Sequence, residues 1–172
     1  MNSKKLTILS LSTALQVVLM FMCLMLPTVK VSMLFIASLL NGIMCAAGYE
    51  KKYVFISYCA TGIVSLLIVS NYIIPIGYII FFGGYGLMHY ASMDRNFIVK
   101  QLIRFAYLVA GLEIVYMAFS STIFASILVK EPYVYFLPVV IVGGYFVFQI
   151  LYDMVIKEIF RIKSLSKLLV EQ

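Results

Sequence analysis

Residues 104–128 read RFAYLVAGLEIVYMAFSSTIFASIL, an apolar run that contains a single carboxylate, Glu113. About 20 apolar residues are enough for a helix to cross the hydrocarbon of a bilayer. Glu113 follows Arg104 by about 13.5 Å along a helix axis, which places it near the bilayer centre, where a carboxylate costs roughly 2.5–3.5 kcal/mol. The run predicts a membrane-spanning helix in which Glu113 either binds a ligand, a cation or a proton, or forms a structural hydrogen bond.

The whole chain has the composition of a membrane protein. Of its 172 residues, 64% are hydrophobic and 12% are charged, and the mean hydropathy is +1.07. A soluble domain is about 45–50% apolar and about 25% charged. We therefore expect one all-α transmembrane domain over residues 1–156. The first apolar run, residues 6–26, has no small-residue cleavage site after it, so we expect it to be retained as a helix.

Six apolar runs, separated by short polar or turn-forming segments, predict a polytopic bundle of six transmembrane helices. Their expected bounds are 6–26, 31–49, 53–69, 73–90, 104–128 and 133–156. On this topology, eleven of the 13 Lys and Arg residues lie on the side of the N-terminus, and only Lys30 and Lys130 lie on the other. Basic residues concentrate on the cytoplasmic side of membrane proteins, so both termini are expected in the cytoplasm.

Residues 157–172 form a basic tail whose apolar residues follow one helical face. We expect this amphipathic tail to lie on anionic lipid at the inner leaflet, or to bind a partner protein. The other basic residues fall at the ends of apolar runs and do not form one patch, which argues against nucleic-acid binding.

Several polar residues inside the runs predict contacts between helices. Arg104 and Asp153 lie near the same end of the last two runs, which should be antiparallel neighbours, so we expect them to pair. The lone amides Gln16, Asn41 and Gln149 should form interhelical hydrogen bonds. The glycine groups 83–86 and 143–144 predict either close helix packing or a kink.

The residues needed for most chemistry at a catalytic or metal site are missing from the sequence. His89 is the only histidine, and Cys23, Cys45 and Cys59 do not have metal-ligand spacing. The sequence contains no phosphate-binding loop and no recognisable nucleophile–base set. We therefore expect no metal, no cofactor and no enzymatic activity.

Polar groups in the outer halves of the later runs predict a cavity that is open to the outside. The candidate ligand-binding residues are Glu113, Tyr116, Ser120, Asn71, Tyr78 and Tyr135. Small residues spaced four apart in the early runs predict helix–helix contacts, within the bundle or with another membrane protein. The candidates for coupling to a partner are Ser10, Ala14, Ser38 and Gly42.

This division of the chain resembles the membrane substrate-binding (S) component of energy-coupling-factor (ECF) vitamin transporters, and related small bacterial six-helix membrane proteins. In that family, an Ala-x-x-x-Ala motif in the first helices faces a transmembrane coupling protein; here the matching stretch is SLSTA, residues 10–14, with Ser in place of the first Ala. The resemblance implies an outward-facing ligand site that includes the first outer loop, where Lys30 lies. It also implies a bacterial cytoplasmic membrane location and an ABC-type ATPase module as a partner.

The leading hypothesis is therefore a membrane-embedded subunit that captures a vitamin-like small molecule for an importer powered by separate ATPases. A first alternative is a stand-alone secondary transporter or channel that uses Glu113. A second is a structural or regulatory membrane protein without a substrate, which binds its partner through the basic tail.

Overall fold

The computed structural model describes residues 3–93, 95–119 and 133–161, and this part of the chain is all-helical. Its elements, in order, are α1 (Ser3–Met25), the 3₁₀ turn η1 (Pro27–Val29), α2 (Lys30–Ala46), α3 (Lys51–Ile68), α4 (Ile73–Gly77), the π-helical segment η2 (Tyr78–Gly83), α5 (Gly84–Ala91), α6 (Phe97–Phe119) and α8 (Tyr133–Arg161). Because α4, η2 and α5 follow one another without a break, they form one interrupted helix, and the six predicted helices are all present.

Within the described residues, four helices are long and apolar enough to cross a membrane, judged by length and composition: α1, α3, the interrupted helix, and α8 over Val139–Ile159. The apolar helix α2 is shorter. Helix α6 begins at Phe97, seven residues before the bound of 104 that the apolar run predicts. That prediction was wrong because hydropathy marks only the apolar part of a helix, whereas Lys100 and Gln101 are also good helix formers.

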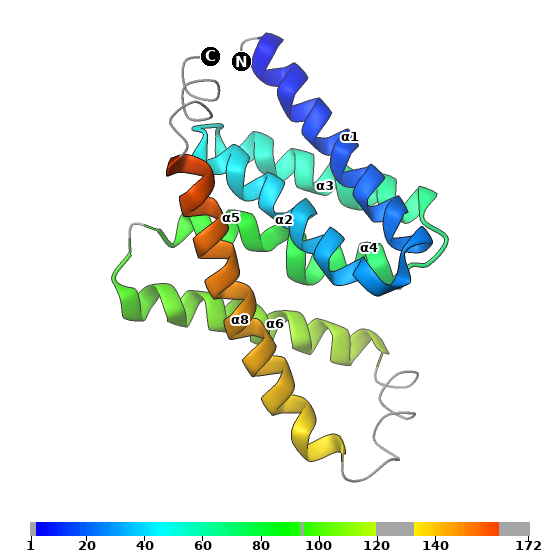
Figure 1. Ribbon diagram of the computed structural model, residues 1–172, viewed down its shortest axis with the longest axis vertical. Helices are drawn as coiled ribbons and strands as arrows, with labels where there is room; N and C mark the ends of the chain where they lie inside the picture. The colour runs from blue at the N-terminus through cyan, green and yellow to red at the C-terminus, as the bar shows by residue number, and fades with distance from the viewer. Residues whose placement is uncertain (1–2, 94, 120–132, 162–172) are drawn as a thin grey trace.

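Successive helices alternate in direction (Figure 1). The start of α1, the α2–α3 connection and the end of α8 lie in the upper part of that view, and the start of α6 lies at its left edge. Most of the basic residues lie on these same segments, among them Lys4, Lys51, Lys52, Arg95 and Lys157. The fold thus gathers positive charge at one end of the bundle, as the sequence pattern requires of a membrane protein with a single orientation.

The first three helices form one side of the bundle, where α1 packs against α2 and α3. Helix α2 also packs against α5 and η2. It therefore connects α1 and α3 to the later helices of the bundle. Helix α8 crosses in front of α5 and α6 and contacts α2, while α6 lies farthest from α1 (Figure 1). The side chains at the α2–α5–α8 contact are mostly aromatic: the Tyr85 ring centroid is 4.8 Å from that of Phe148 and 4.9 Å from that of Tyr152.

The turn between α2 and α3 explains the need for Gly48. Its φ angle is +82°, in the left-handed region that only glycine adopts readily. The Gly48 amide donates to the Cys45 carbonyl and the Tyr49 amide donates to the Met44 carbonyl, both over 3.2 Å. These two bonds form the Schellman motif that commonly ends a helix at a glycine.

Candidate functional site

An ion cluster forms where α5, α6 and α8 meet. The Arg104 guanidinium on α6 donates through Nη1 and Nη2 to the two carboxylate oxygens of Asp153 on α8, each over 3.2 Å. Arg104 is 1% exposed. Lys100 Nζ lies 3.8 Å from Asp153 Oδ2. The predicted pairing of Arg104 with Asp153 is confirmed, and the carboxylate is shared by two cations.

The imidazole of His89 completes the ion cluster from α5. Its Nδ1 is 2.6 Å from Arg104 Nη2 and 3.1 Å from Asp153 Oδ1. A guanidinium can only donate and a carboxylate can only accept, so one nitrogen cannot form a hydrogen bond with both. The shorter contact assigns Nδ1 as an acceptor from Arg104, with the imidazole proton on Nε2. With neutral His89, Arg104 and Lys100 exceed Asp153 by one positive charge.

The surroundings hold Arg104 firmly in place. The Tyr145 hydroxyl donates to the Arg104 backbone carbonyl. The rings of Tyr85 and Tyr152 pack against His89, with centroid distances of 6.2 Å and 5.1 Å. Within the described part of the chain, Arg104 Nε and the Tyr85 hydroxyl are buried without a hydrogen-bond partner, and no group of three or more His, Cys, Asp or Glu side chains could hold a metal.

The interrupted helix is the second polar feature of the bundle. In a π-helix the backbone bonds span five residues, which leaves carbonyls with irregular geometry and free acceptor capacity. Four carbonyls of η2 accept hydrogen bonds from side chains of three other helices. The donors are Tyr58 of α3 to Ile79, Tyr107 of α6 to Ile80, and Ser38 and Asn41 of α2 to Phe82 and Gly83. The segment is therefore held from several sides.

Beside η2 lies the core polar cluster, which consists of Gln16, Asn41, Thr61 and Tyr78. Gln16 Nε2 donates to Asn41 Oδ1 over 2.9 Å, and Gln16 Oε1 accepts from the Tyr78 hydroxyl over 2.6 Å and from Thr61 over 3.2 Å. Asn41 Nδ2 donates to the Tyr78 hydroxyl over 3.0 Å. All four residues are at most 1% exposed. The interhelical hydrogen bonds predicted for Gln16 and Asn41 are confirmed.

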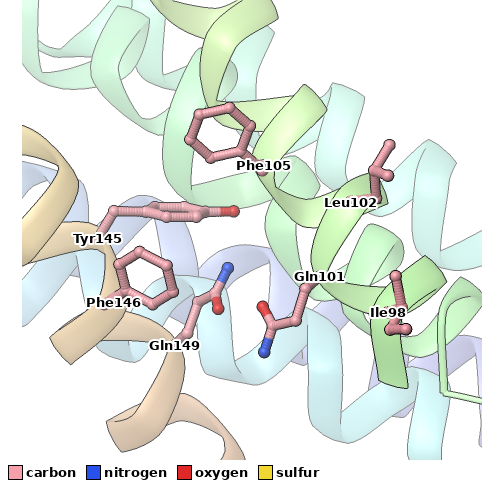
Figure 2. Close-up of a pocket in the computed structure, with 7 residues that line it drawn as sticks. All are labelled: Ile98, Gln101, Leu102, Phe105, Tyr145, Phe146 and Gln149. Atoms are coloured by element: carbon pink, nitrogen blue, oxygen red, sulfur yellow. The ribbon is translucent and has the colours of Figure 1, made fainter. Parts of the chain in front are cut away.

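A groove of about 320 Å³ lies between α6 and α8, beside the ion cluster. Gln101 and Gln149 point toward each other across it in Figure 2. Its remaining lining is mostly apolar and consists of Ile98, Leu102, Phe105, Tyr145 and Phe146. A smaller hollow of about 170 Å³ is lined by Tyr58, Cys59, Gly62, Ile63 and Ile79.

Four of the predicted ligand-binding residues have described side chains, and none of these four lines either hollow: Glu113, Asn71, Tyr78 and Lys30. Glu113 is exposed on the surface of α6. The Tyr78 hydroxyl is already engaged in the core polar cluster, and Asn71 Oδ1 accepts from the Ile73 amide over 3.2 Å. Lys30 is half-buried at the start of α2.

The remaining members of the predicted site are only partly described. Tyr116 belongs to α6 and Tyr135 belongs to α8, but the structure does not describe their side chains. Ser120 lies outside the described residues.

The predicted coupling residues divide into two pairs. Ser10 and Ala14 are exposed on α1. Ser38 and Gly42 are buried in the bundle, where the Ser38 carbonyl accepts from the Tyr152 hydroxyl over 3.0 Å and a Cβ on Gly42 would collide with the same hydroxyl. For this second pair, the small side chains serve contacts within the bundle.

The two glycine groups also differ. A Cβ on Gly86 would lie 2.8 Å from the Gly42 backbone nitrogen, so α2 and α5 are in close contact there. Gly143 and Gly144 have no neighbouring atoms within 4 Å of the same position, so the expected close packing of that pair is wrong within the described residues.

Sequence reasoning missed the groove and the π-helical segment. The only signal for the groove is the pair of glutamines in otherwise apolar helices, of which only Gln149 was noticed. The signals for η2 are Pro75 and the glycines that follow, which mark an irregular helix without specifying its type.

Comparison of the chain with protein-family models, curated proteins and solved structures gave no match.

Proposed function

We propose that this protein is a six-span transport protein of the bacterial cytoplasmic membrane, with both termini in the cytoplasm. In this proposal it captures a vitamin-like small molecule and delivers it to an importer that is powered by a separate ATPase module. The observation that carries the proposal is the interrupted helix α4–η2–α5 in the middle of an apolar bundle. π-Helical segments are frequent at functional sites, and transporters bind their substrates and ions where the regular bonding of a helix is disturbed.

The contacts of η2 support this role. Its carbonyls are held by side chains of α2, α3 and α6, so any change in its hydrogen bonding reaches three other helices. In a helix whose only role is to cross the membrane, the carbonyls accept hydrogen bonds from backbone amides of the same helix. In this proposal, a shift of the η2 carbonyls between side-chain donors and backbone donors is a small step that would open or close a path through the bundle.

The ligand in this proposal enters from the end of the bundle opposite the basic residues. Glu113, Asn71 and Lys30 lie on that side, on α6, before α4 and at the start of α2. Exposed Glu113 is a charged side chain on an apolar helix, which marks a functional position in a membrane protein. We expect ligand binding to depend on it, together with Tyr116, Ser120 and Tyr135.

The coupling surface in this proposal is the outer face of α1. Ser10 and Ala14 are exposed there, next to exposed leucines at positions 11 and 15. Small residues allow a second helix to approach closely. A transmembrane coupling protein would pack on this face, and Ser38 and Gly42 would support it only indirectly, by holding α2 to α5 and α8.

A stand-alone secondary transporter is the second candidate, and the ion cluster favours it. Arg104, Asp153 and His89 form a buried charged group in which two alternative partners compete for one imidazole nitrogen. Ionisable groups of this kind serve as ion or proton relays in carriers that need no ATPase.

Affinity purification of the tagged full chain from its native membrane tests the proposal. We expect a transmembrane coupling protein and ATPase subunits to co-purify, and Ala14→Trp to abolish this without lowering the yield of folded chain. Val147→Trp, at an exposed position on α8 away from this surface, is the control. If the protein purifies alone in several mild detergents, the importer proposal fails. Ion-gradient-driven uptake into liposomes that contain only this chain would then establish the second candidate.

A further inference from the structure

We propose that the groove between α6 and α8 binds an anionic phospholipid of the inner leaflet. One acyl chain lies in the groove, and the headgroup phosphate lies at Lys100 and Lys157. The inference requires that the chain is inserted in a membrane with its basic end at the inner leaflet, but it does not require that the protein transports a substrate.

The lining of the groove selects for an acyl chain. Ile98 is 75% exposed and Leu102 is 66% exposed, and Phe105 and Phe146 are about half exposed. These side chains form the walls seen in Figure 2. In a bilayer such a groove opens sideways to hydrocarbon, where lipid chains pack against apolar side chains at no cost. A polar solute would gain few contacts along these walls.

The cytoplasmic end of the groove is polar and positively charged. Gln101 lies next to Lys100 on α6, and on α8 the residues Gln149, Asp153 and Lys157 follow one another at intervals of four, on one helical face. Both carboxylate oxygens of Asp153 already accept a hydrogen bond from Arg104. Lys100 is 23% exposed at its side chain and Lys157 is exposed, so both remain accessible to a headgroup.

Charge complementarity therefore identifies the lipid as anionic. Basic side chains between membrane helices on the cytoplasmic side attract acidic headgroups, and each lysine near the surface contributes about five-fold in affinity. The amides of Gln101 and Gln149 can donate to the ester and phosphate oxygens that follow the headgroup into the groove. The site combines an apolar wall, hydrogen-bond donors and cations, which match the acyl chain, the ester groups and the acidic headgroup of a phospholipid.

Native mass spectrometry of the full chain in detergent tests this inference. The probes are dioleoyl phosphatidylglycerol, dioleoyl phosphatidylcholine and inorganic phosphate, each added at the same concentration. We expect phosphatidylglycerol to be retained several-fold more than phosphatidylcholine, and phosphate not to compete. Lys157→Gln, which removes no ion pair of the described residues, should reduce the preference about five-fold. The control Lys51→Gln, exposed at the same end of the bundle, should leave it unchanged.

A second pair of variants tests the acyl-chain part of the site. Leu102→Trp fills the groove and should lower retention of both lipids, whereas Ile114→Trp, on the same helix outside the groove, should not. Equal retention of the two lipids overturns the inference, as does equal loss in Lys157→Gln and Lys51→Gln. Competition by inorganic phosphate would also overturn it, because it would indicate a site for a free anion.

Discussion

Asp153 is the carboxylate of the ion cluster, in contact with each of its other three side chains. It accepts two hydrogen bonds from Arg104 and lies beside Lys100 and His89. Burying a guanidinium is costly unless it is paired, so the carboxylate determines whether Arg104 can occupy its position at 1% exposure. The pair joins α6 to α8 at the level where the groove begins.

Asp153→Asn should therefore destabilise the protein. Removing one partner of a buried ion pair costs about 3–5 kcal/mol, and the 29% exposure of the Asp153 side chain points to the lower end of that range. The measurement is thermal unfolding in detergent, with Glu158→Gln as the exposed control. The double variant Arg104→Met/Asp153→Leu should regain most of the lost stability; if it is less stable than Asp153→Asn, the pair has a role beyond mutual neutralisation.

Asn41 has the corresponding role in the core polar cluster. Asn41→Leu removes the acceptor of Gln16 and two donated bonds, to Tyr78 and to the Gly83 carbonyl. Interhelical bonds in membranes contribute about 0.6 kcal/mol each on average, so three of them predict a loss of roughly 2 kcal/mol. Unfolding measurements should show this loss, while Asn71→Leu, in the α3–α4 connection, should have little effect. A stable Asn41→Leu variant would mean that the cluster does not hold the helices together.

At the scale of elements, the backbones of α2 and α5 approach each other closely at two glycines. Gly42 and Gly86 face each other, with the Tyr152 hydroxyl beside both. The contact is possible because neither glycine has a side chain, and it brings Ser38 and Asn41 within reach of the η2 carbonyls. The π-helical segment thus depends on a packing contact one turn away.

Gly86→Ala should force α2 and α5 apart. The added Cβ would lie 2.8 Å from the Gly42 nitrogen and 3.1 Å from the Ser38 carbonyl oxygen, and neither backbone atom can move aside alone. Overpacking of this kind costs about 1–3 kcal/mol. The matched control is Gly143→Ala on α8, where the space is open and the substitution should stabilise the helix by about 0.5–1 kcal/mol. Equal unfolding temperatures for the two variants would contradict the close contact.

At the scale of the whole molecule, the gathering of basic residues at one end is the feature that orients the bundle. We expect a reporter fused after Lys52 to be cytoplasmic and one fused after Lys130 to be external, since the basic end should stay inside. Protease protection in membrane vesicles provides an independent check. External signal from the Lys52 fusion would reverse the orientation, and with it the side from which a ligand enters and the leaflet that supplies lipid to the groove.

The helices were predictable because each is determined by a local property of the chain. An apolar run of about 20 residues forms a membrane-spanning helix, and the Lys and Arg residues at its ends determine which end lies on the cytoplasmic side. The Arg104–Asp153 pair was predictable for a related reason: two charges at the same depth of neighbouring antiparallel helices have few other partners. The sequence predicted that Gln16 and Asn41 form interhelical hydrogen bonds, but it did not predict the residues to which they bond.

The π-helical segment, the groove and the direction of Glu113 depend on which helices become neighbours and how closely they pack. Sequence pattern located Glu113 along its helix but not around it, and α6 packs at the edge of the bundle through the face that carries Arg104 and Tyr107. The depth of a residue follows from the length of an apolar run, which is local. The side of the helix on which it meets a partner follows from side-chain contacts between distant segments, and these exist only in the folded bundle.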